Sequence, residues 1–154
     1  MNPLMSTEEA VVELWVERTL RSYPVETLWF LSGEQDPFRN PVGQTLRKGL
    51  AVLAGEVLGA MNKDRMMEAL DALVRMRAVQ DFSPADAVRF VFTLRAAIGE
   101  ATGAVSESMH SRIDELALMT FDKYVSCREQ IFQLRVNELR SRMDYALASE
   151  EAEE

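Results

Sequence analysis

Residues 106–148 of the chain, SESMHSRIDELALMTFDKYVSCREQIFQLRVNELRSRMDYALA, contain neither glycine nor proline. Because these two residue types are the ones that most often end a helix, the segment is predicted to form one uninterrupted helix. At 1.5 Å per residue the helix is about 60 Å long, whereas a folded domain of this size is about 40 Å across. Unless it bends, the helix extends beyond its own domain.

Two apolar stripes run along this predicted helix, although a helix on the surface of a domain needs only one. One stripe consists of Ile113, Ala117, Thr120, Tyr124, Cys127, Ile131 and Leu134, and the other of Leu118, Phe121, Val125, Phe132, Val136, Leu139 and Met143. We therefore expect one stripe to face the core of the domain and the other to face a second chain. The alternative is a bent helix with both stripes inside one core. The dimer contact is assigned to Tyr124, Cys127, Ile131, Leu134 and Glu138.

The rest of the chain reads as four further helices with clear starting signals. Ser6 and Glu9 form a capping box for a helix that ends near Ser22. Asn40 before Pro41, Asn62, and Ser83 before Pro84 are cap residues for the other three. The last of these, residues 85–101, is apolar on nearly every side and is expected to be buried. No alternating strand pattern is present, so the predicted fold is all-α.

Two further features before residue 60 lead to structural predictions. Residues 26–31 are predicted to add a short turn of helix containing Trp29 and Phe30. Glycine recurs in the helix that follows Pro41, where each glycine destabilises a helix by about 1 kcal/mol relative to alanine. Such glycines indicate that another backbone or a bound molecule approaches closely, and we favour a second helix. The glycines are Gly43, Gly49, Gly55 and Gly59.

The composition limits the class of protein. An apolar fraction of 47 % and a charged fraction of 27 % are typical of a folded domain, assigned to residues 1–149, with an acidic, disordered tail at residues 150–154. The net charge of −8 argues against nucleic acid and anionic membranes as partners. The single Cys127 forms no internal disulfide, and neither a leader peptide nor a membrane-spanning run is recognised. The chain is expected to be cytoplasmic.

Few residues in the sequence indicate catalysis, metal binding or ligand binding. The single histidine, His110, stands between serines near a helix start, which excludes a multi-histidine metal site and argues against haem. An arginine-rich group is expected where two loops meet. It either clamps a carboxylate or phosphate ligand or pairs with neighbouring acids to hold the loops. Its members are Arg39, Arg75, Arg77, Gln80 and Asp81. No catalytic residue, metal site or cofactor is predicted.

Three segments together carry a family resemblance: DPFRNPVG at 36–43, RAVQDFSP at 77–84, and CREQI at 127–131 with RVNE at 135–138. Over about residues 9–142 the chain resembles the RsbRD N-terminal domain family, helical domains that precede a STAS domain in RsbR-type stressosome co-antagonists. The resemblance implies a globin-like bundle without haem that dimerises, with a helix leading toward the STAS partner. No STAS segment occurs within the 154 residues, so the chain is expected to depart from this pattern.

The resulting functional hypothesis is a non-enzymatic signalling domain that acts through homodimerisation and contacts with an unidentified protein partner. One alternative is a globin-like sensor that binds a small molecule or haem. The resemblance also implies another, an accessory protein of a respiratory redox system, because stand-alone copies of the family occur in sulfate-reducing bacteria.

Overall fold

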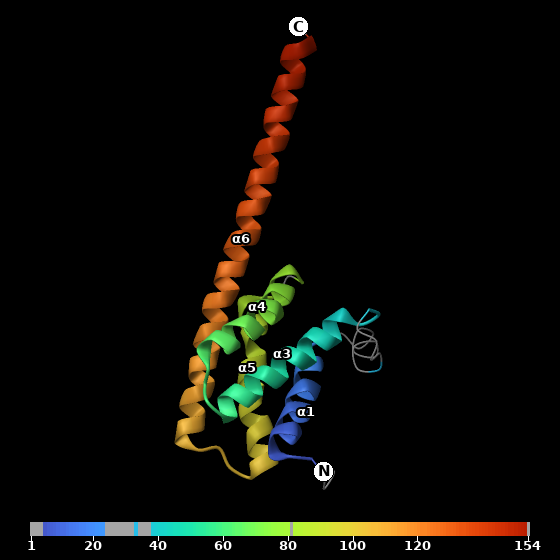
Figure 1. Ribbon diagram of the computed structural model, residues 1–154. Coiled ribbons are helices and arrows are strands. Elements are labelled where there is room, and N and C mark those ends of the chain that lie inside the picture. The colour runs from blue at the N-terminus through green and yellow to red at the C-terminus, as the bar shows by residue number, and fades with distance from the viewer. Residues whose placement is uncertain (1–4, 24–32, 34–37, 81, 154) are drawn as a thin grey trace.

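The computed structural model of the chain describes residues 5–23, 33, 38–80 and 82–153. These residues form no strand, and the all-α prediction is confirmed (Figure 1). The short helical turn expected at 26–31, and Asp81, lie outside the described residues. The helices are α1 (Thr7–Leu20), α3 (Pro41–Leu58), α4 (Lys63–Val79), α5 (Pro84–Thr102) and α6 (Glu107–Glu153).

The helices begin at the cap residues that the sequence indicates. The Ser6 hydroxyl accepts a hydrogen bond from the amide of Glu9 (3.2 Å), while the Glu9 carboxylate accepts one from the amide of Ser6 (2.7 Å). Asn40, Asn62 and Ser83 accept hydrogen bonds from the amide three residues ahead, at 2.9, 3.1 and 3.2 Å. Each cap satisfies an amide that has no partner within its own helix.

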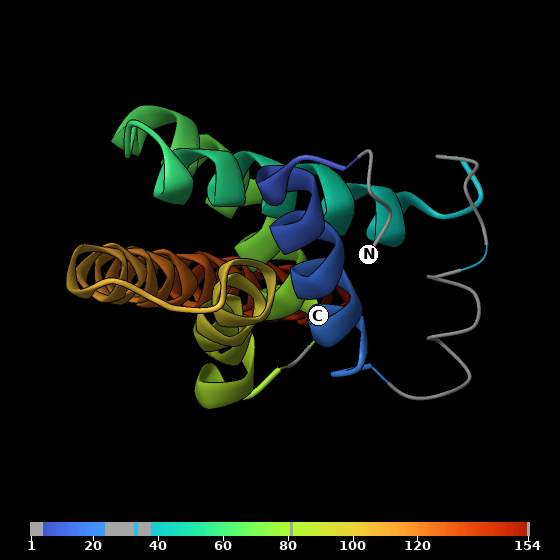
Figure 2. The same ribbon diagram turned by 90° about the horizontal axis from the view of Figure 1, so that it is seen from below.

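The core lies where α1, α3, α4 and α5 pack on one another and on the start of α6. Seen from below, α1 crosses in front of the other helices (Figure 2). Trp15 is fully buried, its indole Nε1 donates to the Phe90 carbonyl (2.6 Å), and the two rings stack with centroids 5.9 Å apart. This pair joins α1 to α5 by an apolar contact and satisfies the one polar atom of the indole.

Gly49 marks the close crossing of α3 and α4. A Cβ atom at this position would lie 2.7 Å from the side chain of Leu73, closer than real Cβ contacts allow. The helix–helix approach predicted from the recurring glycines is therefore present at Gly49, where the missing side chain lets α4 pack directly against α3.

Helix α6 is 47 residues long, or about 70 Å. Figure 1 shows the other helices gathered around its first half, while its second half runs away from them to the C-terminus. Every residue from 137 to 152 is exposed. The predicted overhang is thus confirmed, and the helix continues past its expected end near Ala148 to include Glu150 and Glu151 of the predicted tail. Within the described residues, no helix combines the length and apolarity needed to cross a membrane.

Candidate interaction surface

Helix α6 divides into an anchored half, residues 107–131, and a free half, residues 132–153. The anchored half packs against α4 and α5 through one face whose side chains are at most 8 % exposed. This inner face consists of Ile113, Leu116, Ala117, Thr120, Tyr124 and Cys127. Burial of this stripe ties the first half of the helix to the domain.

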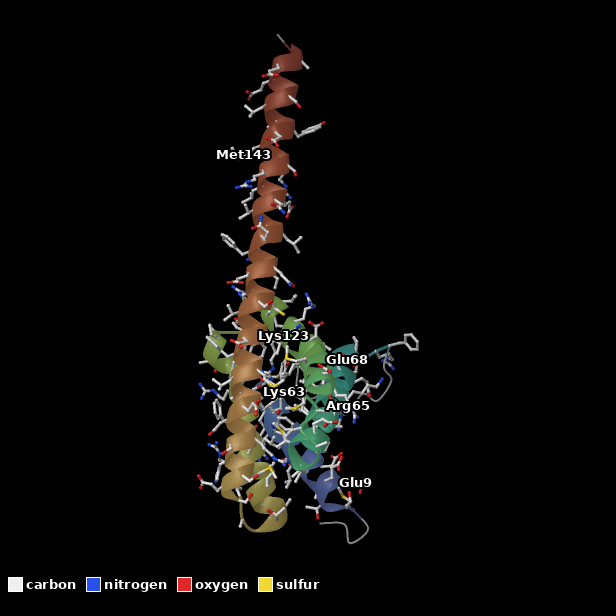
Figure 3. All side chains as sticks on the ribbon, turned by 60° about the vertical axis from the view of Figure 1, so that its left-hand side comes forward. Glu9, Lys63, Arg65, Glu68, Lys123 and Met143 are labelled. Carbon is white, nitrogen blue, oxygen red and sulfur yellow. The ribbon has the colours of Figure 1, made fainter. Side chains whose placement is uncertain are left out.

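Polar contacts fix the anchored half around its buried face. The Tyr124 hydroxyl donates to the carbonyl of Phe82 (2.7 Å), at the corner between α4 and α5. Arg112 donates to the carbonyls of Val57 (2.9 Å) and Gly59 (2.7 Å), which satisfies acceptors at the C-terminal end of α3. Figure 3 shows Lys123 at the level of the domain and Met143 far out on the free half.

Asp71 of α4 forms an ion pair with the anchored half of α6. Its Oδ1 lies 2.6 Å from Lys123 Nζ and 3.1 Å from Arg75 Nη2. The hydrogen bond from Lys123, and then that from Arg75, holds the pKa of Asp71 below its usual value. The carboxylate therefore stays ionised and links α4 to α6.

A second face of α6 stays uncovered along most of the helix. Its residues lie within about 80° of one another, counted at 100° per residue. Leu118, Phe132 and Met143 expose between 65 and 69 % of their surface, and Phe121 exposes 49 %. We call this face the outer stripe: Leu118, Phe121, Val125, Phe132, Val136, Leu139, Met143 and Leu147.

A groove between α5 and α6 borders the outer stripe in the anchored half. It is made of two neighbouring hollows of about 340 and 580 Å³ that share Pro84 and Phe121. Phe92 of α5 stands at its edge, 48 % exposed. We call it the α5–α6 groove, and it is lined by Phe82, Ser83, Pro84, Ala85, Val88, Arg89, Phe92, Phe121, Tyr124, Val125, Arg128 and Glu129.

The structure distributes the sequence-predicted contact residues over both halves. Tyr124 and Cys127 are 3 % and 2 % exposed and belong to the core of their own chain, while Ile131 is half-buried. Leu134 and Glu138 are exposed on the free half, on the side that continues the inner face. The residues open to another chain next to the domain are instead those of the outer stripe, which the sequence shows as a second apolar repeat.

The predicted arginine-rich group is split by the geometry of α4. Arg75 and Arg77 are two residues apart, so their side chains point in nearly opposite directions around the helix. Arg75 lies toward α6, where its Nη1 donates to Gln130 Oε1 (3.3 Å), while Arg77 is buried. Gln80 accepts from the Tyr23 hydroxyl (3.2 Å) near Arg77, and Arg39 is exposed.

Arg77 is enclosed by aromatic rings rather than by carboxylates. Its guanidinium carbon lies 4.7, 5.0 and 5.7 Å from the ring centroids of Phe82, Phe90 and Tyr23, and Nη1 donates to the Asp86 carbonyl (3.1 Å). Burial lowers the pKa of Arg77 from its high ordinary value, and the nearby Tyr23 and Asp86 oppose that shift. Cation–π contacts with three rings stabilise the buried charge at the corner where α1, α4 and α5 meet.

Metal-binding chemistry finds no support in the part of the chain that the structure describes. No group of three or more histidine, cysteine, aspartate or glutamate side chains lies close enough there to hold an ion. His110 is half-buried in the first turn of α6, and Cys127 is buried in the core.

Comparison with known proteins gives one family and one relative. The family described as the RsbT co-antagonist protein RsbRD N-terminal domain matches residues 9–139. An uncharacterized protein of Archaeoglobus fulgidus is 28 % identical over 151 residues, covering 90 % of this chain and 93 % of that protein. No solved structure matches the chain.

Proposed function

The chain belongs to the RsbRD N-terminal domain family, and from this premise we propose that it is a non-enzymatic regulatory domain that pairs with a second copy of itself and contacts a signalling protein. The family is named for a co-antagonist of RsbT, a role carried out by protein–protein contacts. The proposal assigns those contacts to α6, the element that extends from the domain.

The outer stripe is the observation that carries this proposal. From Leu118 to Leu147 it covers about 45 Å of helix, and its large apolar side chains face solvent. Exposed apolar patches of this extent mark protein interfaces. A stable interface buries about 800 Å² on each partner, and the proposal draws on both the outer stripe and the α5–α6 groove to reach that area.

The use made of the charged side chains supports a non-enzymatic role. Asp71 binds Lys123 and Arg75, and Asp86, whose pKa is held low by hydrogen bonds from Ser83 and Arg89, belongs to the start of α5. Shifted pKa values also occur at catalytic sites. Here the groups with shifted pKa values make contacts that hold helices together.

Native mass spectrometry of the protein and of two matched variants tests the proposal. The unaltered chain is expected at twice 17.4 kDa. Phe132→Asp places a charge in the outer stripe and is expected to give a monomer with unchanged far-ultraviolet circular dichroism. Leu134→Asp alters a side chain of the same 68 % exposure on another side of the helix and is expected to remain a dimer.

Two results would count against the proposal as stated. A monomeric unaltered protein at micromolar concentration contradicts pairing itself. A Phe132→Asp dimer beside a Leu134→Asp monomer keeps the pairing but moves the contact to the residues predicted from the sequence, which include Leu134.

A further inference from the structure

The outer stripe has nearly the same spacing on both sides of Phe132. Val125 and Leu139 lie seven residues before and after it, and Phe121 and Met143 lie eleven residues before and after it. The outermost pair follows the same order, with Leu118 fourteen residues before and Leu147 fifteen residues after. Val136 has no apolar counterpart, because Arg128 lies four residues before Phe132, but for these three pairs the stripe reads almost the same in either direction along the helix.

This symmetry has a consequence for the way two copies can pair. When two identical helices run antiparallel across a two-fold axis, a residue ahead of the axis on one faces the residue equally far behind it on the other. With the axis at Phe132, apolar residues then meet apolar residues at each of these positions. A parallel pair matches every residue with itself, so it imposes no such symmetry on the sequence.

We propose that two copies pair with their α6 helices antiparallel, and that the free half of each α6 lies in the α5–α6 groove of the other. This inference rests on the homodimer proposed above and adds its direction and its contacts. Met143 of the second copy comes to lie at Phe121, next to Phe92, where its sulfur meets two exposed aromatic rings. Leu139 of the second copy lies at Val125.

The lengths of α5, whose first part from Pro84 to Phe92 lines the groove, and of the free half agree with this seating. The free half has 22 residues, about 33 Å, and α5 has 19 residues, about 28 Å. A free half laid along α5 therefore covers the groove from one end to the other. It also packs against two helices, which buries more of its apolar surface than a single helix would.

The charges at the end of α6 favour the same direction. Glu150 and Glu151 lie in its last turns. In a parallel pair the two acidic ends stand side by side, whereas in the antiparallel pair they lie at opposite ends of the dimer. Each Glu150 then arrives at the level of Asp114, where Arg95 already forms an ion pair with that carboxylate (2.8 Å).

Disulfide cross-linking in a Cys127→Ala background tests the direction. A mixture of Val125→Cys and Leu139→Cys proteins is expected to form a covalent heterodimer under mild oxidation. Leu139→Cys alone is expected to remain non-covalent, because its two copies lie about 20 Å apart along the helix. Both positions are exposed, at 38 % and 60 %, so neither substitution disturbs the core.

Native mass spectrometry on the same samples tests the homodimer separately from the antiparallel direction of its helices. A dimer in which Leu139→Cys cross-links to itself, or in which no combination cross-links, overturns the antiparallel pairing and leaves the homodimer standing. A monomer overturns both. Should Cys127→Ala fold poorly, the set is repeated with Cys127 in place, since that thiol is 2 % exposed, and the unaltered protein serves as the control.

Discussion

The anchored and free halves of α6 are one continuous helix in two different environments. In the anchored half one face is buried against α4 and α5, and in the free half every residue from 137 to 152 is exposed. Backbone hydrogen bonds within a helix are local, so the geometry continues unchanged past the edge of the domain. The stability of the helix decreases beyond that edge, because most of the stability of a helix in a protein comes from packing. The free half therefore lacks the packing that stabilises the anchored half.

Hydrogen exchange in the monomer is expected to show the largest difference between the halves. In Phe132→Asp, amides of residues 137–150 are expected to exchange at least about a thousandfold faster than those of residues 113–127. Opening the anchored half requires close to global unfolding, whereas an isolated helical end opens at almost no free-energy cost. Equal protection in the two halves would show that the free half is stable by itself.

A leucine-to-alanine change in each half compares how much a buried and an exposed leucine contribute to the free energy of unfolding. Leu116 is fully buried, and Leu116→Ala is expected to lower the free energy of unfolding by about 3 kcal/mol through the cavity it leaves. Leu134 is 68 % exposed, and Leu134→Ala is expected to change it by less than about 0.5 kcal/mol. Urea denaturation measures both, and a large loss at Leu134 would mean that this side of the free half is also covered.

Tyrosine-to-phenylalanine changes in the two halves test whether the hydrogen bond of Tyr124 helps to hold α6 against the domain. Tyr124→Phe removes the hydroxyl that donates to the Phe82 carbonyl and is expected to cost about 1 kcal/mol. Tyr145 is 79 % exposed in the free half, and Tyr145→Phe is expected to have almost no effect. If the two variants unfold at the same urea concentration, the hydrogen bond at Tyr124 does not anchor α6.

The smallest effect is expected at Asp71, in its dependence on pH. Its pKa is lowered on folding, so its contribution to stability is present above the unfolded pKa of about 4 and is lost as pH falls through the folded value. Asp71→Asn is expected to cost less than about 1 kcal/mol near pH 7, because the side chain is 41 % exposed. The difference from the unaltered protein should shrink below about pH 4. A difference that stays constant would contradict the ion pair.

Local features of the fold were predictable because their causes are local. Ser6, Asn40, Asn62 and Ser83 cap helices through hydrogen bonds that reach three residues ahead, and both partners can be read from the sequence. The length of α6 follows in the same way from the absence of glycine and proline. Phe92, in contrast, was expected inside a buried helix and stands half-exposed beside the groove, because its exposure depends on where α6 lies relative to α5.

The proposed contact surface was predictable only in part, for the same physical reason. The sequence shows two apolar stripes on α6, but which one faces the core depends on how α4 and α5 are placed around the helix. Tyr124 and Cys127 fill the core of their own chain, and the outer stripe stays uncovered. Arg75 and Arg77 are close in sequence, and they separate in the structure because α4 turns them apart.

Because the two halves of α6 are one continuous helix, a tilt of the anchored half is transmitted to the far end of the free half. The free half extends about 33 Å from the level of Phe132. A tilt of about 5° in the anchored half moves its far end sideways by about 3 Å. A small tilt inside the domain is thus enlarged at the end of α6 into a displacement comparable to the size of a side-chain contact.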